Sequence, residues 1–223
     1  MQLHVKNLSI TSESTTLLED LTFDVSGGEV ITIMGPSGCG KSTLLSALAG
    51  HLSPVFNVSG NIDVDGDDVA ALPAEKRAIG ILFQDDLLFP HLNVWQNLAF
   101  GISSNHSANE KQDMAMQTLT EIGLSDIAWH APQNISGGQR ARISLMRTLL
   151  SSPKVLLLDE PFSKLDRPLR KAFRQFVFSQ ITQRNIATVM VTHDEDDVPP
   201  KGKCIQWPKL PTTVPLEESN QDA

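Results

Sequence analysis

Residues 35–43 are the stretch that most constrains this chain. Their sequence, Gly-Pro-Ser-Gly-Cys-Gly-Lys-Ser-Thr, fits the pattern G-x-x-x-x-G-K-[ST]. The apolar run at 30–34 predicts a buried strand before it, and residues 43–49 predict a helix after it that ends at Gly50. Glycines let a backbone approach an anion closely, and the N–H groups at the start of a helix point toward it. The stretch therefore predicts a loop that cradles the phosphates of a nucleoside triphosphate.

Individual residues of this loop have distinct expected roles. Lys41 supplies a positive charge near the β- and γ-phosphates, and Ser42 offers its hydroxyl to Mg²⁺. The other residues expected to contact the nucleotide are Gly35, Pro36, Ser37, Gly38, Cys39, Gly40 and Thr43.

Length and composition limit the class of protein. A chain of 223 residues can build one full core, or one core with an inserted subdomain. Its formal net charge of −8 argues against nonspecific binding to nucleic acid. Cys39 and Cys204 lack the spacing of a metal site, so we expect free thiols in a reducing compartment. Neither a membrane-spanning run nor a signal peptide is visible, which predicts a soluble intracellular protein.

The periodicity of apolar residues predicts an α/β chain with two additions. Residues 3–8 and 21–25 alternate apolar and polar side chains, as half-buried antiparallel strands do. Residues 60–66 predict a further strand and a tight turn. From residue 85 to about 151 the period becomes helical, with a polar loop at 103–109. A helical block is therefore expected inside an α/β domain.

Two adjacent carboxylates follow a second buried strand. Residues 155–158 are apolar without alternation, which suits a parallel strand covered on both faces. Asp159 and Glu160 stand at its carboxyl end, where open α/β sheets bind ligands. Asp159 can hold the shell of Mg²⁺, and Glu160 can polarise a water for attack on the γ-phosphate.

Two other stretches leave alternatives open when they are read from the residues alone. Ser136 is a natural N-cap for a helix over 141–150, and the two glycines after it leave backbone N–H groups free for an anion. The same residues could equally form an ordinary capped turn. Residues 187–191 predict a last parallel strand, and His193 just beyond it is either a γ-phosphate contact or an ordinary histidine.

These motifs follow one another in an order that is found in a known family. The series comprises residues 35–43, Gln84, 136–139, 157–161, 165–166 and His193. Over about residues 1–198 the chain resembles the nucleotide-binding subunit of an ATP-binding cassette (ABC) transporter. The sequences at 83–85 and 88–94 most resemble bacterial importers of inorganic ions, thiamine and polyamines. Overall, the chain is most similar to an uncharacterised bacterial subgroup of such importer subunits.

The resemblance implies a fold and a division of the chain. The fold would be α/β, a P-loop NTPase with a RecA-like core of mainly parallel sheet, an N-terminal antiparallel β subdomain and an inserted α-helical subdomain. Residues 1–84 and 152–208 would form the core with the β subdomain, and residues 85–151 the helical subdomain with the signature motif. Together they would make one ATP-binding domain over 1–208. The strand that customarily closes this fold is expected to be short or absent, and residues 209–223 predict a disordered tail.

The resemblance also implies cofactors and residue roles. ATP and Mg²⁺ would be the cofactors. Gln84 would touch Mg²⁺ and sense the membrane partner, and Asp166 would communicate across a dimer. Glu160 would be the catalytic base, Lys41 a catalytic phosphate contact, and His193 would stabilise the γ-phosphate.

The resemblance further implies partners and a location. Two copies would form a head-to-tail homodimer, in which the phosphate loop of one copy closes on ATP together with Ser136, Gly137, Gly138 and Gln139 of the other. Residues 85–97 would form the groove for a transmembrane permease, and a periplasmic solute-binding protein would take part only indirectly. The protein would then be peripheral, on the cytoplasmic face of the inner membrane, with no nucleic acid partner.

Two other functions compete with an importer subunit. A soluble ABC ATPase acting on DNA or ribosomes would favour paired cassettes, a long coiled-coil insertion or a basic surface, and the sequence shows none of these. A nucleotide-gated regulatory module with little hydrolysis is suggested by the lack of an adenine-stacking aromatic residue at 11–16 and by the unusual C-terminus. Glu160 and His193 speak against that module. The transported solute is not specified by this sequence.

Overall fold

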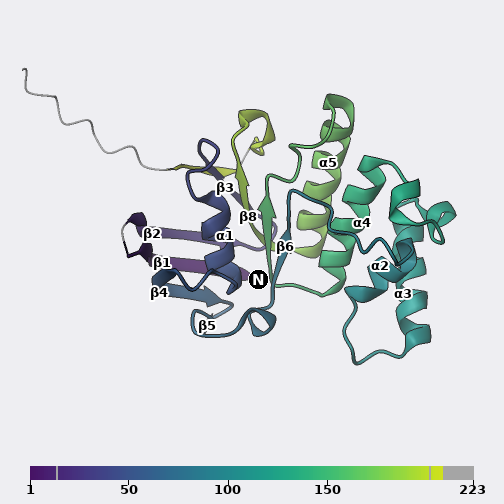
Figure 1. The fold of residues 1–223 in the computed structure, drawn as a ribbon, viewed down its shortest axis with the longest axis horizontal. Helices are drawn as coiled ribbons and strands as arrows, with labels where there is room; N and C mark the ends of the chain where they lie inside the picture. Colours follow the sequence, from purple (N-terminus) through teal and green to yellow (C-terminus); the bar gives the residue numbers. More distant parts are fainter. Residues whose placement is uncertain (14, 201, 208–223) are drawn as a thin grey trace, which may run out of the picture.

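Two sheets and the helices around them make up a computed structural model that describes residues 1–13, 15–200 and 202–207 (Figure 1). The tail expected at 209–223 lies outside the described residues, as does residue 208, the expected end of the domain. The predicted α/β fold is confirmed.

Four strands from the N-terminal half of the chain form an antiparallel sheet in the order β2-β1-β4-β5. Its strands are β1 (Gln2–Ser12), β2 (Thr16–Ser26), β4 (Phe56–Val64) and β5 (Asp67–Asp68). The alternating patterns in the sequence correctly predicted the first two strands, which extend beyond the alternation at both ends. Alternate side chains of β1, such as Leu3 and Val5, point into the core, so this sheet has one buried face.

The second sheet is parallel and has the order β6-β7-β8-β3-β9. Its strands are β6 (Ile79–Leu82), β7 (Val155–Asp159), β8 (Ala187–Thr192), β3 (Val30–Met34) and β9 (Lys203–Gln206). Because the strands are parallel, their carboxyl ends lie along one edge. The phosphate loop after β3, the carboxylates after β7 and the histidine after β8 are therefore neighbours.

The expectation that residues 187–191 form the last parallel strand was wrong. β9 follows and pairs with β3, from Ile31 opposite Lys203 to Met34 opposite Gln206. It is short, as expected for the closing strand. No apolar run signalled it, because most of its side chains are exposed and the backbone ladder at the sheet edge defines it.

The parallel sheet is buried on both faces. Leu157 of β7 packs with α1 (Lys41–Ala49) and the antiparallel sheet. Leu156 and Leu158 point the other way, toward α5 (Arg167–Arg184) and the helical block. This double coverage explains why the strand sequence shows no alternation.

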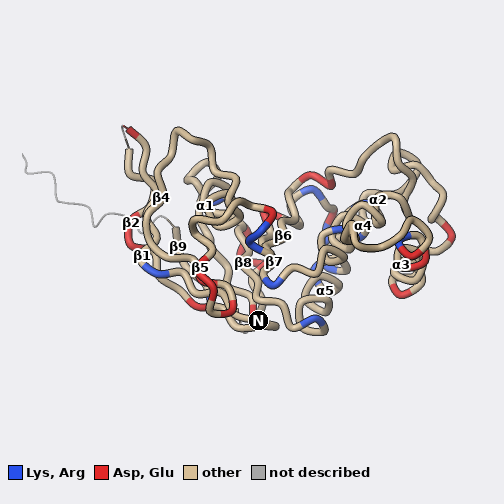
Figure 2. Tube along the Cα trace, turned by 90° about the horizontal axis from the view of Figure 1, so that it is seen from below, with Lys and Arg blue, Asp and Glu red and all other residues tan. Residues whose placement is uncertain are grey.

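The helical block contains α2 (Val94–Phe100), α3 (Ala108–Glu121) and α4 (Gly137–Leu150). Figure 2 shows these helices at the end of the molecule opposite β1, β2 and β4. The expected loop at 103–109 ends earlier than predicted, because Ser107 caps α3 and the helix begins at Ala108. Short 3-10 turns lie at Ala74–Lys76, Ser125–Ile127, Pro132–Asn134 and Glu195–Asp197. None of the helices described in the structure has the length and apolar character needed to cross a membrane.

Candidate active site

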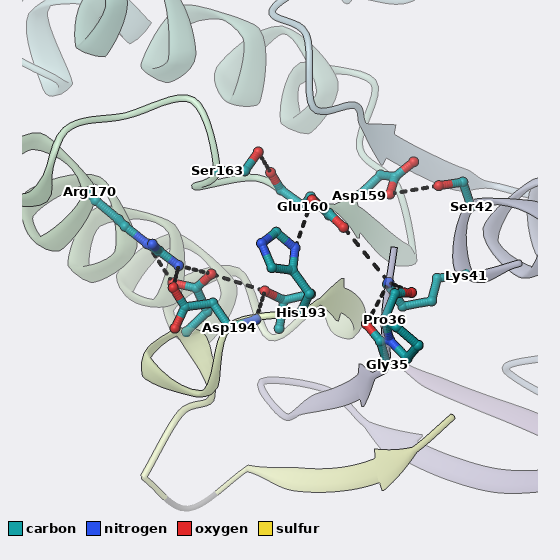
Figure 3. A network of polar contacts seen from close by, with 12 residues as sticks. Gly35, Pro36, Lys41, Ser42, Asp159, Glu160, Ser163, Arg170, His193 and Asp194 are labelled. Atoms are coloured by element: carbon teal, nitrogen blue, oxygen red, sulfur yellow. Dashed lines mark hydrogen bonds and ion pairs between the residues drawn. The ribbon is translucent and has the colours of Figure 1, made fainter. Parts of the chain in front are cut away.

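The loop after β3 folds around the ammonium group of Lys41 (Figure 3). Lys41 Nζ donates hydrogen bonds to the carbonyl oxygens of Gly35 and Pro36, each at 2.8 Å, and the side chain is only 5% exposed. Gly40 caps α1 with a φ of 97°, a left-handed conformation that suits glycine, and no side chain caps this helix end. The first amides of α1 are thus available to an anion.

Asp159 ends β7 beside the start of α1. Its Oδ1 accepts a hydrogen bond of 3.1 Å from the Ser42 hydroxyl. Burial raises the pKa of the Asp159 carboxyl, and the negative charge of Glu160 raises it further, whereas the Ser42 hydrogen bond and Lys41 act in the opposite direction. The structure thus joins a hydroxyl and a carboxylate that the sequence placed far apart.

Glu160 lies between the phosphate loop and the end of β8. Its Oε1 is 3.8 Å from Lys41 Nζ, and its Oε2 is 3.1 Å from Nδ1 of His193 (Figure 3). Its φ of 44° is in the left-handed region, which costs a non-glycine residue about 1–3 kcal/mol and often marks a functional site. The backbone is held by hydrogen bonds from Glu160 N–H to Val191 O and from the Ser163 hydroxyl to Glu160 O. These bonds hold the carboxylate between a cation and an imidazole.

Many of the predicted site residues surround one open pocket of ≈ 390 Å³. Its lining comprises Ser37, Gly38, Gly40, Lys41, Ser42, Thr43, Gln84, Asp159 and Glu160. A larger cavity of ≈ 560 Å³ lies beside Val25, Ile31 and Ile181, and none of the predicted site residues lines it. We therefore identify the smaller pocket as the candidate active site on the chemistry of its lining.

Other predicted site residues do not line this pocket. Ser136 caps α4, where its hydroxyl accepts from the Gln139 N–H at 3.2 Å and the Gln139 side chain accepts from the Ser136 N–H at 2.9 Å. Gly137 and Gly138 form the first turn of that helix. Asp166 caps α5 by accepting from the Leu169 N–H at 3.0 Å. The helix start at Ser136 is capped as predicted, and both helix starts lie outside the pocket within one chain.

Sequence reasoning missed an ion-pair cluster that supports His193. Arg170 donates through Nε and Nη2 to the two carboxylate oxygens of Asp197, at 2.9 and 2.6 Å. Its Nη2 also lies 2.7 Å from a carboxylate oxygen of Asp194 (Figure 3). The Thr192 hydroxyl donates to Asp197 and accepts from the Asp194 N–H, each at 3.1 Å. Both neighbours of His193 are thereby fixed. The acidic run after this strand was visible in the sequence, but it did not identify the distant arginine that pairs with it.

One family model covers the segments that build this pocket. The family model described as "ABC transporter" matches residues 18–163, which include the phosphate loop, Gln84, the start of α4 and the carboxylate pair. The chain belongs to the ABC transporter family. It is therefore an ATPase of the P-loop type that binds ATP, as the motif order implied.

Relatives of this ABC ATPase include both uncharacterised and import proteins. It is 44% identical over 206 residues to the uncharacterized ABC transporter ATP-binding protein YnjD of Escherichia coli, covering 91% of this chain and 95% of that protein. It is 39% identical over 196 residues to the spermidine/putrescine import ATP-binding protein PotA of Haemophilus influenzae, covering 87% of this chain. It is 37% identical over 202 residues to the sulfate/thiosulfate import ATP-binding protein CysA of Pseudomonas aeruginosa, covering 88% of this chain. The match spans 52% and 60%, respectively, of these two import proteins.

Proposed function

We propose that this ABC ATPase powers a bacterial importer as a head-to-tail dimer bound to a membrane permease. One observation supports the proposed dimer. The phosphate loop and the carboxylates line one pocket, but residues 136–139 do not line it, although they begin a helix whose amides could bind an anion. A second copy can bring that helix start onto the phosphates. The import direction follows the names of the relatives PotA and CysA.

The proposed chemistry assigns a separate task to each side chain around Glu160. Lys41 is charged and buried, so it can exchange its contact with Glu160 for a phosphate oxygen. Glu160 can then orient a water and accept its proton. His193, held at 3.1 Å from Glu160, fixes that carboxylate and contacts the γ-phosphate.

Ser42, Gln84 and Asp159 would hold Mg²⁺. All three offer oxygen donors, they line the same pocket, and the Ser42 and Asp159 oxygens are 3.1 Å apart. This set fits Mg²⁺, which prefers oxygen ligands and takes only one or two carboxylates when phosphates and water complete its shell. Bound Mg²⁺ would neutralise the charge that develops on the phosphate oxygens.

The proposed permease site lies at the helical end of the molecule, around residues 85–97. Large apolar side chains are exposed in and around this segment: Phe83 by 42%, Leu87 by 56%, Phe100 by 65% and Trp129 by 63%. Exposed apolar groups that gather in one region favour a protein partner. In this proposal residues 85–151 form the arm that contacts both the permease and the second copy. The subunit then lies on the cytoplasmic face of the membrane, and a solute-binding protein acts only through the permease.

The proposed chemistry is tested with Glu160→Gln. We expect ATP hydrolysis to fall at least about 100-fold, because the amide cannot accept a proton. ATP binding should persist, and gel filtration in ATP and Mg²⁺ should show a dimer. Glu75→Gln is the matched control, since Glu75 is exposed on a short turn outside the pocket. A Glu160→Gln variant that hydrolyses ATP like the wild type would refute the catalytic role. A wild type that binds ATP but neither hydrolyses it nor dimerises would favour the regulatory module.

A further inference from the structure

Trp207 ties the end of β9 to the strand before the phosphate loop and to the loop itself. Its backbone N–H donates to the carbonyl oxygen of Met34, the last residue of β3, at 2.6 Å. Its indole Nε1 donates to the carbonyl oxygen of Cys39 at 2.8 Å. The side chain is only 5% exposed and belongs to the core cluster beside α1. A residue outside every recognised motif thus bonds directly to the loop.

The indole bond fixes the direction of one peptide in the loop. In a trans peptide the C=O and the following N–H point in opposite directions. With the Cys39 carbonyl held by Trp207, the Gly40 N–H must point to the opposite side of the loop. Gly40 lines the candidate active site and caps α1. Trp207 therefore controls an amide at the position where a phosphate would bind.

Packing leaves this part of the loop little freedom to adjust. A Cβ built on Gly35 would lie 2.0 Å from the carbonyl oxygen of Trp207, and one built on Gly40 would lie 2.7 Å from Leu17 Cδ1. The loop is thus in close contact with Trp207, which directly follows β9, and with Leu17 of β2. Lys41 Nζ donates hydrogen bonds to the carbonyl oxygens of Gly35 and Pro36. The carbonyl oxygen of Cys39 accepts its hydrogen bond from Trp207 instead.

We propose that Trp207 is a positioning residue for phosphate binding, which acts through the Cys39–Gly40 peptide. The inference rests on the proposed function in that the ligand is a nucleotide polyphosphate. Loss of the indole N–H lets this peptide rotate, and phosphate binding then weakens. Glu160 and His193 are untouched by the change, so the effect belongs to binding and not to the proton transfer.

The chain provides a matched control for this residue. It contains three tryptophans, Trp95, Trp129 and Trp207. The Trp95 indole nitrogen is buried and has no hydrogen-bond partner among residues 1–13, 15–200 and 202–207. Trp207→Phe therefore removes a bonded N–H, whereas Trp95→Phe removes an unbonded one, and both variants keep an aromatic ring.

The test measures the binding of Mg-ADP and of inorganic tripolyphosphate by calorimetry, on the full chain. We expect Trp207→Phe to raise the Kd of both ligands about three- to tenfold, the effect of one lost neutral hydrogen bond. Trp95 lies in the segment proposed for the permease and does not line the nucleotide pocket, so in the absence of a permease Trp95→Phe should leave both Kd values unchanged. An equal Kd for Trp207→Phe and the wild type would overturn the inference. A wild type that binds neither ligand would overturn the proposed function, and the inference with it.

A spectroscopic measurement on the wild type keeps the test independent of how well the variant folds. The ¹⁵N-indole spectrum has one resonance per tryptophan, and Trp95→Phe and Trp129→Phe identify two of them. We expect saturating Mg-ADP to shift the Trp207 resonance and to leave that of Trp129, which is 63% exposed, in place. An unmoved Trp207 resonance in a chain that binds ADP would contradict the role, because a purely structural tryptophan would behave in that way.

Discussion

Asp159 and Glu160 are adjacent carboxylates with different surroundings. Asp159 accepts from Ser42, and burial raises its pKa. Glu160 is turned by its left-handed backbone toward Lys41 and His193. These surroundings match the different roles proposed for the two acids: Asp159 would bind Mg²⁺, and Glu160 would accept a proton from water.

Asp159→Asn should make the nucleotide-free protein more stable at pH 7. A raised pKa means that the folded chain binds this proton more tightly than the unfolded chain does. The stability of the fold therefore falls as the pH rises above the pKa of Asp159 in the unfolded chain, which is about 4. The amide removes this penalty and keeps an acceptor for Ser42. Below about pH 4 the difference should disappear, because Asp159 is protonated in both states. Urea unfolding at pH 7 and at low pH tests this, and a variant less stable than the wild type at pH 7 would contradict it.

The sequence correctly indicated those functional residues that stand close together along the chain. The glycines, Lys41 and Ser42 all lie within residues 35–43, so their sequence pattern alone indicated a phosphate loop. The support that Arg170 gives to the histidine strand, and that Trp207 gives to the loop, joins segments distant in sequence. No local pattern encodes such contacts.

The helices α2, α3 and α4 each begin with a capping box, and in α3 and α4 the capping residue is a serine. Ser107 and Glu110 form a capping box at α3, and Ser136 and Gln139 form one at α4. Both serines are exposed. The two helix starts are therefore alike in local structure, and only the second has a proposed role with nucleotide.

Ser136→Ala and Ser107→Ala should differ in activity but not in stability. Each variant should lose about 1 kcal/mol of unfolding free energy, the usual value of a serine N-cap. Only Ser136→Ala should lower ATP hydrolysis, by about tenfold, because its hydroxyl would face the ATP held by the other copy. Urea unfolding and a steady-state ATPase assay give the two numbers. Equal hydrolysis by the two variants would argue against a signature site at α4.

For whole elements, prediction succeeded where burial leaves a pattern in the side chains. The apolar run of β7 and the helical period of α4 were both read correctly. The position of β9 was not predicted, since its four residues form an edge ladder with mostly exposed side chains. An edge strand of this kind is held by backbone hydrogen bonds, which do not depend on particular side chains. Its sequence therefore shows no pattern that predicts a strand.

The whole molecule has a β end and a helical end with the parallel sheet between them (Figures 1 and 2). Exposed apolar side chains occur at both, and Leu87 and Val55 are 56% and 63% exposed. Leu87 lies in the segment proposed to bind the permease, whereas Val55 precedes β4 at the other end. The two residues thus form a natural pair for testing the partner surface.

Leu87→Asp should abolish co-purification with a co-expressed cognate permease, and Val55→Asp should not. Both changes place a charge on an exposed position, so neither should disturb the core. The ATPase activity of the isolated subunit should be retained in both. Loss of permease binding in Val55→Asp alone would move the interface to the β end.

Mixing two inactive variants tests whether each ATP is enclosed by two copies of this chain. Lys41→Ala disables the phosphate loop, and Ser136→Arg blocks the helix start of α4. In a head-to-tail dimer of the two variants, both defects fall on one site and the other site is intact. Each variant alone should be inactive, and the mixture should hydrolyse ATP. A mixture as inactive as its components would contradict the composite site.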